Sequence, residues 1–443
     1  MEELLARLDE PSARGLAAAV SQAIGDGVLK PGAKLPPIRQ VAHHLGLSPT
    51  TVNAAWQLLS RSGAIHADGR RGTVIAEPRG TGPRRYRSAL RQHAAFALDL
   101  STGVPDPALL PDLGPALRRA HATAPSSYLD EPVVAELEEL LRAVWPYDVA
   151  RLAIFDGAMD ATDHLVSSVL RLGDRAVVES PCFPPLLDLL NAVGVQAIGV
   201  RLDADGPVPA ELADALRQRP AAVFLQPRAH NPTGVSWSTA RMRELAQLLA
   251  TSPSTVVIED DSAGDIAASP ALSLGGLLPS QTVHIRSFSK SHGPDLRLAA
   301  VSGPAAILDP VLERRLLGQG WTSRLLQHLL LDLLRDPASI AAVAKARKVY
   351  ARRRSLVVET LRRDGLEVSG TDGINLWLPV ADEQAALISL ASEGVGAAAG
   401  AAFQTSPARP HLRVTVGLIA KSHADVARRL SRATQAAPWS APR

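Results

Sequence analysis

Hydrophobic positions in the first eighty residues recur at the spacing of short helices. Apolar residues predict helices around residues 16–24, 38–45 and 52–59. Gly46 ends the second helix, and Ser48-Pro49 supplies an N-cap followed by proline at the first position of the third. Residues 64–67 and 73–76 then read as the two strands of a hairpin with a basic tip. This order is typical of a winged helix-turn-helix (α+β) over residues 1–77, although a small helical bundle with a hairpin would give a similar pattern.

The pattern changes at about residue 98. Short apolar runs rich in β-formers alternate from there with helical stretches rich in Ala, Leu and Arg. The alternation predicts an α/β domain with a mostly parallel sheet over residues 98–435, followed by a tail at 436–443. A helical segment around 312–334 and a smaller C-terminal α/β subdomain over about 356–433 complete it. The expected strands are at 151–154, 176–179, 221–225, 255–258, 282–285 and 299–302.

Between the two patterns, residues 78–97 are rich in Pro, Gly and Arg and form a linker by composition. From Arg61 to Arg91 there are eight arginines against Asp68 and Glu77, although the net charge of the whole chain is only +3. A polyanion would bind where this local excess lies. A solvated surface and tether is the alternative interpretation of the same charges.

The composition of the 443 residues, 46% hydrophobic and 21% charged, is that of a soluble globular protein with more than one domain. Cys182 is the only cysteine, which excludes a disulfide framework or zinc cluster within the chain and fits a reducing cytosol. We expect no metal site. Without an export signal or an apolar run of ~20 residues, we also expect a cytoplasmic protein that does not enter a membrane.

The most informative local motif is Ser287-Phe288-Ser289-Lys290, which follows an apolar, strand-like run and precedes Arg297 by seven residues. The hydroxyls and Arg297 can hold a phosphate while the lysine amine condenses with an aldehyde. The motif therefore suits a Schiff-base lysine beside a phosphate site, although the same residues also occur in ordinary loops.

Two upstream segments supply what a pyridoxal phosphate (PLP) ring needs. Asn231, in Asn231-Pro232-Thr233-Gly234, can hydrogen-bond a ring phenolate oxygen, although alone the segment is good turn chemistry. Asp260 lies at the C-terminal end of an apolar strand, where a carboxylate can reach a ligand and keep a pyridine nitrogen protonated. Alone it would be an acidic cap. The order Asn231, Asp260, Lys290, with spacings of 29 and 30 residues, favours the cofactor interpretation.

Together these motifs resemble the fold-type I aminotransferases of class I/II over roughly residues 98–433. The resemblance implies that Lys290 is the catalytic lysine that forms the internal aldimine with PLP. It also implies that Asp260 contacts the pyridine nitrogen and that Asn231 contacts the phenolate oxygen. The resemblance further implies that the phosphate is bound by Arg297, by Ser287 or Ser289, and by the backbone amides of Gly157-Ala158-Met159, which begin a helix.

By the same resemblance, Phe183 in Pro181-Cys182-Phe183-Pro184 stacks on the ring, and Tyr128 reaches the phosphate of a partner subunit. Core packing is the alternative for both aromatics. Arg413 matches the arginine that grips a substrate or effector carboxylate. The family usually carries a tyrosine just after the Asp260-type aspartate, whereas here Asp260-Asp261 is followed by Ser262. The loss of that phenol weakens control of the aldimine proton but leaves PLP binding intact.

The N-terminal segment resembles the GntR family of DNA-binding domains, on the stretch from Leu35-Pro36-Pro37-Ile38 to Val52 and on Arg70-Arg71-Gly72-Thr73. Pro37, Pro49 and Asn53 depart from the residues common in that family, so base preference cannot be carried over. The DNA-binding residues that we expect are Arg39, Ser48, Thr50, Thr51, Asn53, Arg70, Arg71, Gly72 and Thr73.

A GntR-like domain joined by a linker to an aminotransferase-like domain is the arrangement of the MocR-type regulators. The resemblance implies a homodimeric, PLP-dependent transcriptional regulator that binds double-stranded operator DNA. Its large domain would sense PLP, or a small amine or amino acid through an external aldimine. Two alternatives stay open at this point. One is an active aminotransferase with an autoregulatory DNA-binding domain, which Arg413 favours and Ser262 disfavours. The other is a GntR regulator with a degenerate pocket.

Overall fold

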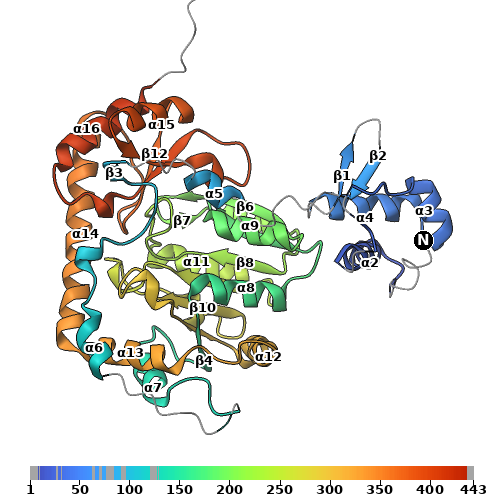
Figure 1. Cartoon of the computed structure of the whole chain (residues 1–443), viewed down its shortest axis with the longest axis horizontal. Coiled ribbons are helices and arrows are strands. Elements are labelled where there is room, and N and C mark those ends of the chain that lie inside the picture. Colours follow the sequence, from blue (N-terminus) through green and yellow to red (C-terminus); the bar gives the residue numbers. More distant parts are fainter. Residues whose placement is uncertain are drawn as a thin grey trace, which may run out of the picture.

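The computed structural model describes residues 8, 10–25, 28–30, 32–61, 65–68, 72–75, 84–90, 96–119, 127 and 129–436. The described part of the N-terminal domain, drawn in blue in Figure 1, contains three helices and a hairpin. Leu16, Val52 and Ile75 are fully buried in its core. Its elements are α2 (Ala13–Gly25), α3 (Ile38–Leu45), α4 (Pro49–Arg61), β1 (Ile65–Asp68) and β2 (Gly72–Ile75).

The predicted winged helix-turn-helix is therefore confirmed. Gly46 ends α3 in the left-handed region at φ 64°, which glycine adopts without a Cβ clash. Strands β1 and β2 pair antiparallel, and a bridge between Lys34 and Val74 adds the connector to the hairpin. The tip, residues 69–71, lies outside the described residues.

The large domain is built on an eight-stranded sheet in the order β4-β11-β10-β9-β8-β5-β6-β7. The central strands β10, β9, β8, β5 and β6 pair in parallel, whereas β11 runs antiparallel to β4 and β10. The strands are β4 (Arg151–Phe155), β5 (Arg175–Ser180), β6 (Gln196–Asp203), β7 (Gly206–Pro207), β8 (Ala222–Leu225), β9 (Val256–Asp261), β10 (Thr282–Ser287) and β11 (Ala299–Gly303).

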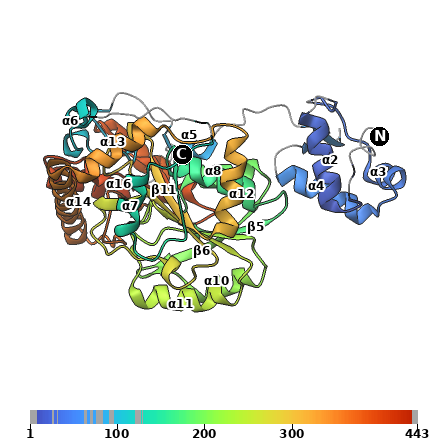
Figure 2. The same cartoon turned by 90° about the horizontal axis from the view of Figure 1, so that it is seen from below.

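Helices cover both faces of this sheet, and Figure 2 shows α10 and α11 on the side opposite α8 and α12. Phe155, Leu165 and Val301 belong to the hydrophobic cluster on the α8 side, and Val177, Leu212 and Leu245 to the cluster on the other. The helices are α6 (Leu113–Arg119), α7 (Ala135–Ala143), α8 (Ala158–Val169), α9 (Pro184–Ala192), α10 (Pro209–Leu216), α11 (Thr239–Ala250), α12 (Ala305–Leu316) and α13 (Arg324–Arg335).

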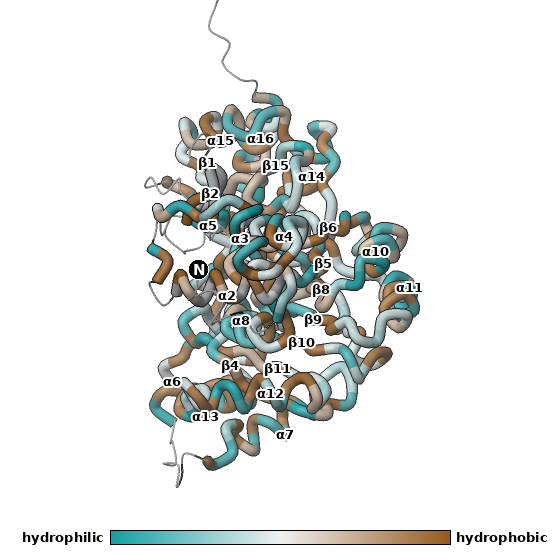
Figure 3. Tube along the Cα trace, turned by 90° about the vertical axis from the view of Figure 1, so that its right-hand side faces the viewer, coloured by the Kyte–Doolittle hydropathy of each residue, from teal (hydrophilic) through white to brown (hydrophobic). Residues whose placement is uncertain are grey.

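The covering helices carry both hydrophilic and hydrophobic positions (Figure 3), as expected for elements with one buried and one exposed side. Short 3-10 helices connect several elements: Pro107–Leu109, Gly264–Ile266, Leu274–Gly276, Pro294–Leu296, Gly400–Phe403 (η6) and Val416–Leu418. In the described part of the chain, no helix has both the length and the apolar composition that crossing a bilayer requires.

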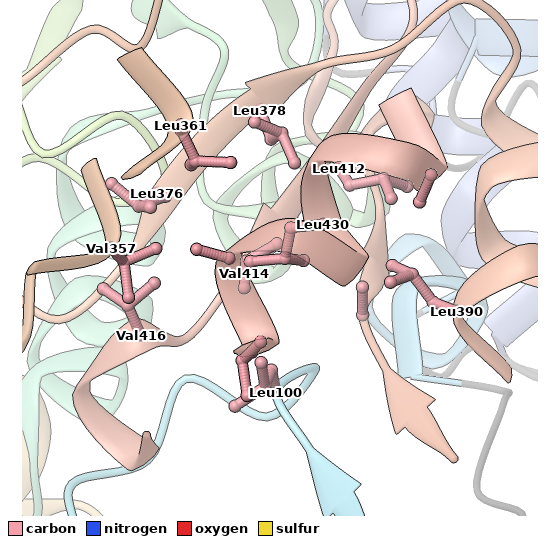
Figure 4. Close-up of a cluster of buried hydrophobic side chains, with 14 of the residues drawn as sticks. Leu100, Val357, Leu361, Leu376, Leu378, Leu390, Leu412, Val414, Val416 and Leu430 are labelled. Atoms are coloured by element: carbon pink, nitrogen blue, oxygen red, sulfur yellow. The ribbon is translucent and has the colours of Figure 1, made fainter. Parts of the chain in front are cut away.

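The smaller subdomain has a three-stranded sheet with its own core, shown in Figure 4. Leu376, Leu412 and Leu430 are fully buried there. Its first residues come from far upstream, because β3 (Leu98–Asp99) pairs in parallel with β13 (Val395–Gly396). The other elements are α14 (Pro337–Arg363), β12 (Leu376–Pro379), α15 (Glu383–Ser392), β14 (Ala398–Ala399), β15 (His411–Val414) and α16 (His423–Thr434).

All six predicted strands of the large sheet are confirmed, and three features differ from the sequence prediction. The helical segment expected around 312–334 is two helices, α12 and α13, because the chain turns between them with Gly320 at φ 74°. Strand β6 was not predicted, since its alternating, half-exposed residues lack an apolar run. A helix, α5 (Arg84–Leu90), lies inside the segment predicted to be a linker. The domain boundaries at 77 and 97 remain predictions.

Candidate functional site

The candidate site lies where the central strands end. Lys290 follows β10, and its Nζ donates a hydrogen bond to the carbonyl oxygen of Ser262, 3.3 Å away, just beyond the end of β9. Burial lowers the pKa of Lys290; nearby Asp260 opposes this and Arg413 reinforces it. A lowered pKa increases the neutral fraction of the amine, and the neutral amine is the form that attacks an aldehyde.

Asp260 lies on β9 with its two carboxylate oxygens in different situations. Oδ2 accepts a hydrogen bond from Gln226 Nε2 at 2.8 Å, whereas Oδ1 is buried with no hydrogen-bond partner among the described residues. Burial raises the pKa of Asp260 to about 6, against the opposing effects of Lys290 and Gln226. A buried carboxylate oxygen without a partner is destabilising unless a donor arrives, so this atom suits the N–H of a pyridinium ring.

Gln226 is a site residue that the sequence reasoning missed. Its Oε1 accepts from the backbone N–H of Asn231 at 2.8 Å, so one amide side chain holds both Asp260 and Asn231. Its own backbone N–H donates to Glu179 Oε2 at 2.7 Å. Its position directly after β8, at the sheet edge where ligands bind, was the available signal.

Asn231 is 7% exposed and lies in the loop after β8. Its Oδ1 accepts from Asn375 Nδ2 at 3.2 Å, and Thr415 Oγ1 donates to Asn375 Oδ1 at 3.1 Å. Both partners come from the C-terminal part of the chain and were not predicted. The site therefore joins the central sheet to the smaller subdomain.

The predicted phosphate residues lie around the start of α8. Gly157 precedes the helix at φ 103°, and a Cβ on it would come within 3.0 Å of Arg297 Nη2. Glycine is required for both reasons, and it leaves the first amides of α8, those of Ala158 and Met159, accessible beside a guanidinium. Arg297 Nη2 donates to the carbonyl of Asp156 at 3.1 Å.

The two serines of the lysine motif contact each other. Ser287 is buried at the end of β10, and its Oγ accepts from the backbone N–H of Ser289 at 3.3 Å. Together with Arg297 and the helix start, they offer the donors that a phosphate monoester needs.

Phe183 directly precedes α9 and lines a narrow cavity with Met159, Gln226 and Asp260. The ring of Tyr86, on α5, meets the ring of Phe183 edge to face, with centroids 6.1 Å apart and an interplanar angle of 72°. A flat ring beside Asp260 would thus meet an aromatic neighbour. The predicted Tyr128 lies outside the described residues.

Arg413, on β15, is 3% exposed, and its guanidinium lies over the ring of Phe403 at 5.5 Å. One Nη donates to the carbonyl of Ser101, while Nε is buried with no hydrogen-bond partner among the described residues. Burial lowers the pKa of Arg413 to about 10, and nearby Tyr86 and Asp99 oppose this. A buried guanidinium with an unused donor can receive a carboxylate.

The neighbouring carboxylate, Asp261, belongs to a separate network. Its Oδ2 pairs with Arg228 Nη2 at 2.7 Å, and both side chains are nearly buried. Burial acts to raise the pKa of Asp261, but Arg228, His284 and Arg286 together lower it below its usual range. Since successive residues of a strand point to opposite faces, Asp260 faces the site and Asp261 stabilises the fold behind it.

The N-terminal domain presents exposed polar residues on α3 and α4. Arg39, Thr50 and Asn53 are exposed, as a DNA contact requires. Ser48 instead caps α4, because its Oγ accepts from the N–H of Thr51 at 3.0 Å and also hydrogen-bonds the Thr51 hydroxyl at 2.7 Å.

Two of the predicted wing residues are described. Gly72 begins β2 at φ 86°, and the carbonyl of Thr73 accepts from the N–H of Leu35 at 2.9 Å. Arg70 and Arg71 lie outside the described residues.

The fold and the site define a fold-type I, PLP-binding domain attached to a winged helix-turn-helix. Residues 97–430 match the family described as aminotransferase class I and II, and residues 12–75 match the gntR family of bacterial regulatory proteins. The chain belongs to the MocR-type transcriptional regulators of the GntR family, which combine these two domains.

Two relatives match most of the chain. It is 36% identical over 435 residues to the vitamin B6 salvage pathway transcriptional repressor PtsJ of Salmonella typhimurium, a match covering 96% of this chain and all of PtsJ. It is 28% identical to the pyridoxine biosynthesis transcriptional regulator PdxR of Corynebacterium glutamicum, over 77% of each chain. The aspartate aminotransferase structure from Thermus thermophilus, with maleate, shares the fold at a TM-score of 0.67 and 22% identity, covering 78% of this chain and 93% of that one.

The protein is thus a PLP-binding transcriptional regulator. The residues present fit the cofactor, because the chain offers an unpartnered buried carboxylate oxygen on Asp260, a nearby lysine with a lowered pKa and a glycine-arginine cradle at the start of α8.

Proposed function

We propose that this protein regulates genes of vitamin B6 supply and that PLP itself is the effector. The names of PtsJ and PdxR support this choice, since both refer to pathways that provide the cofactor. The observation that carries the proposal is the unpartnered Oδ1 of Asp260, which a pyridinium nitrogen would satisfy. Binding at this atom depends on the cofactor concentration, which is the quantity that such a regulator needs to report.

In this proposal each residue acts on a different part of PLP. Asp260 holds the ring nitrogen, Asn231 the phenolate oxygen, and Phe183 stacks on the ring. Lys290 provides the amine for covalent attachment. The phosphate contacts are Arg297, Ser287, Ser289 and the amides of Ala158 and Met159, together with Tyr128 of a second copy.

PLP supplies an aldehyde that condenses with primary amines and a ring that withdraws electrons. Efficient amino-group transfer also needs directed proton movement, which typically contributes ~10²–10⁴-fold. Ser262 offers no phenol there, and its carbonyl oxygen instead accepts a hydrogen bond from Lys290. We therefore propose a sensor with little turnover, in which Arg413 binds the carboxylate of an amino-acid effector as a second input.

We propose that the protein is a homodimer, and exposed apolar side chains in one region support this. Leu129, Leu316 and Leu317 are 84%, 55% and 91% exposed. Leu129 and Leu316 line the same cavity, and Leu317 is the next residue after Leu316. Exposed leucines concentrated in one region are typical of a surface that another chain covers. Tyr128 lies next to Leu129 in sequence, so a copy docked here would bring that residue toward the neighbouring site.

For DNA we propose that Arg39, Thr50 and Asn53 contact the operator, with Gly72, Thr73, Arg70 and Arg71 at the wing. Ser48 and Thr51 act by fixing the start of α4, the helix that would enter the major groove. A regulator that binds operators in a bacterium works in the cytoplasm.

The experiment is to capture genomic DNA fragments with the full-length protein, with and without PLP, and to sequence them. We expect fragments near genes of vitamin B6 metabolism, with an affinity that changes when PLP is added. Borohydride reduction of the PLP complex should fix the cofactor to the peptide containing Lys290. A Lys290→Ala variant that retains the same reducible absorption would refute the attachment, and DNA affinity independent of PLP would refute the effector.

A further inference from the structure

Helix α5 is the first described element of the chain after the hairpin of the DNA-binding domain. Only residues 76–83 separate Ile75, the end of β2, from Arg84, the first residue of α5. Eight residues can span at most about 30 Å even when fully extended. A change in the position or order of α5 therefore acts on the DNA-binding domain through a short connection.

The packing of α5 places it against the cofactor site. The ring of Tyr86 meets Phe183, which lines the cavity beside Asp260, and Tyr86 is also close enough to Arg413 to act on its charge. Ala89, 2% exposed, belongs to the same hydrophobic cluster as Phe403, the ring beneath Arg413. One face of α5 thus contacts the surroundings of both the ring and the carboxylate.

The start of α5 is held from outside the cavity. Asp188 on α9 accepts hydrogen bonds from the backbone N–H groups of Arg85 and Tyr86, each at 3.2 Å, through its two carboxylate oxygens. Arg85 Nη1 donates to the carbonyl of Gln404 at 2.7 Å, next to η6. These contacts join α5 to the large domain on one side and to the smaller subdomain on the other.

A helix of seven residues has no stability of its own in water, because nucleation is costly and few hydrogen bonds follow it. The order of α5 therefore depends on Asp188, on the cluster around Ala89 and on the rings of Phe183 and Tyr86. A ligand that fixes Phe183 or Arg413 would stabilise the helix, which is the differential contact that a conformational response requires.

We propose that Tyr86 forms part of the ligand pocket and that α5 carries the state of this pocket to the DNA-binding domain. The proposal rests on the proposed function, since it takes PLP as the ligand, and it adds the element that transmits binding. PLP that stacks on Phe183 orders α5, and the ordered helix restrains the short connection and thus the placement of the winged helix-turn-helix.

The test uses full-length protein, PLP and a DNA fragment recovered by genomic capture. Four proteins are compared: the wild type, Asp188→Ala, Tyr86→Ala and Ser88→Ala, the last a control on the exposed side of α5. For each, the PLP dissociation constant, the DNA dissociation constant with and without saturating PLP, and hydrogen exchange of residues 84–90 are measured.

We expect PLP to change DNA affinity of the wild type and of Ser88→Ala by roughly 5–150-fold and to slow exchange in α5. In Asp188→Ala, PLP affinity should fall by no more than in Tyr86→Ala, because the loosened helix gives up only the Tyr86 contact, while the ratio of the DNA dissociation constants with and without PLP falls toward one. Tyr86→Ala should weaken PLP binding by roughly twofold to tenfold through the lost ring pair, and Tyr86→Phe should restore it.

The outcomes separate this inference from the function on which it rests. If PLP leaves DNA affinity of the wild type unchanged, both fail. If the wild type responds and Asp188→Ala responds equally, or if PLP leaves exchange in α5 unchanged, only the role of α5 is refuted.

Discussion

Replacing Asp260 by asparagine should stabilise the PLP-free protein at neutral pH. Burial raises the pKa of this carboxyl from 3.8 to about 6. A carboxyl with a raised pKa in the folded state binds its proton more tightly there than in the unfolded chain. At a pH where the group is protonated in both states, it therefore does not lower the free energy of unfolding. The penalty develops as the pH rises from about 4 to about 6 and is complete above that range.

The size of the effect follows from the shift. A rise of about two pKa units lowers the free energy of unfolding by about 3 kcal/mol at pH 8. At pH 5 the loss is about half that value, because Asp260 is ionised in the unfolded chain but still mostly protonated in the folded one. Asp260→Asn removes the penalty, since the amide carries no charge. The free energy of unfolding of the variant should therefore exceed that of the wild type by about 3 kcal/mol at pH 8 and by clearly less at pH 5.

Urea unfolding of the PLP-free, full-length protein at both pH values measures this difference. Asp295→Asn, at an exposed position, is the matched control and should change stability by less than about 0.5 kcal/mol. With saturating PLP the lead of the variant at pH 8 should shrink to about 0–1.5 kcal/mol, because the variant loses a charged hydrogen bond to the ligand worth about 1.5–3 kcal/mol, or roughly 10–150-fold in affinity. An Asp260→Asn protein that is less stable than the wild type at pH 8, or whose advantage does not shrink at pH 5, would contradict the reasoning.

Three further changes have expected outcomes. Asp261→Asn should destabilise the protein by about 3–5 kcal/mol in urea unfolding, because Arg228 stays buried without its partner; a loss below 1 kcal/mol would contradict a buried ion pair. Gln226→Leu should weaken PLP binding by roughly tenfold in an absorbance titration, because both Asp260 and the backbone N–H of Asn231 lose their hydrogen bond to the Gln226 side chain. Unchanged affinity would exclude this positioning role. Arg39→Ala should lower the slope of log affinity for DNA against log salt by about one, whereas an unchanged slope would place this residue away from the phosphates.

The strands of the sheet were predictable because they are buried on both faces and therefore read as short apolar runs. The positions of Lys290, Asp260 and Asn231 were predictable because each follows or ends a strand that local sequence marks as an apolar run, whereas their roles toward PLP remain predictions. Strand β6 escaped because its exposed and half-buried residues alternate without an apolar run. Gln226 escaped as well, since its importance lies in two contacts that only the folded chain brings together.

Helix α5 shows the limit of composition. Its sequence is arginine-rich, and the Pro and Gly residues before it predict a linker. The helix forms because Asp188, about a hundred residues away in sequence, accepts its first free N–H groups, and because Ala89 finds a buried place. Such tertiary stabilisation leaves no local signature in seven residues.

The pairing of β3 with β13 has a consequence for protein engineering. After α5, the chain passes through the smaller subdomain by this pairing and adds its first strand to the main sheet only at β4. A reporter protein fused before Arg84 would therefore replace the DNA-binding domain at the position nearest the pocket, whereas one fused behind α16 would lie on a helix that has no part in the site. A genetically encoded vitamin B6 indicator should accordingly be built at the upstream junction, with the spacing of residues 76–83 retained.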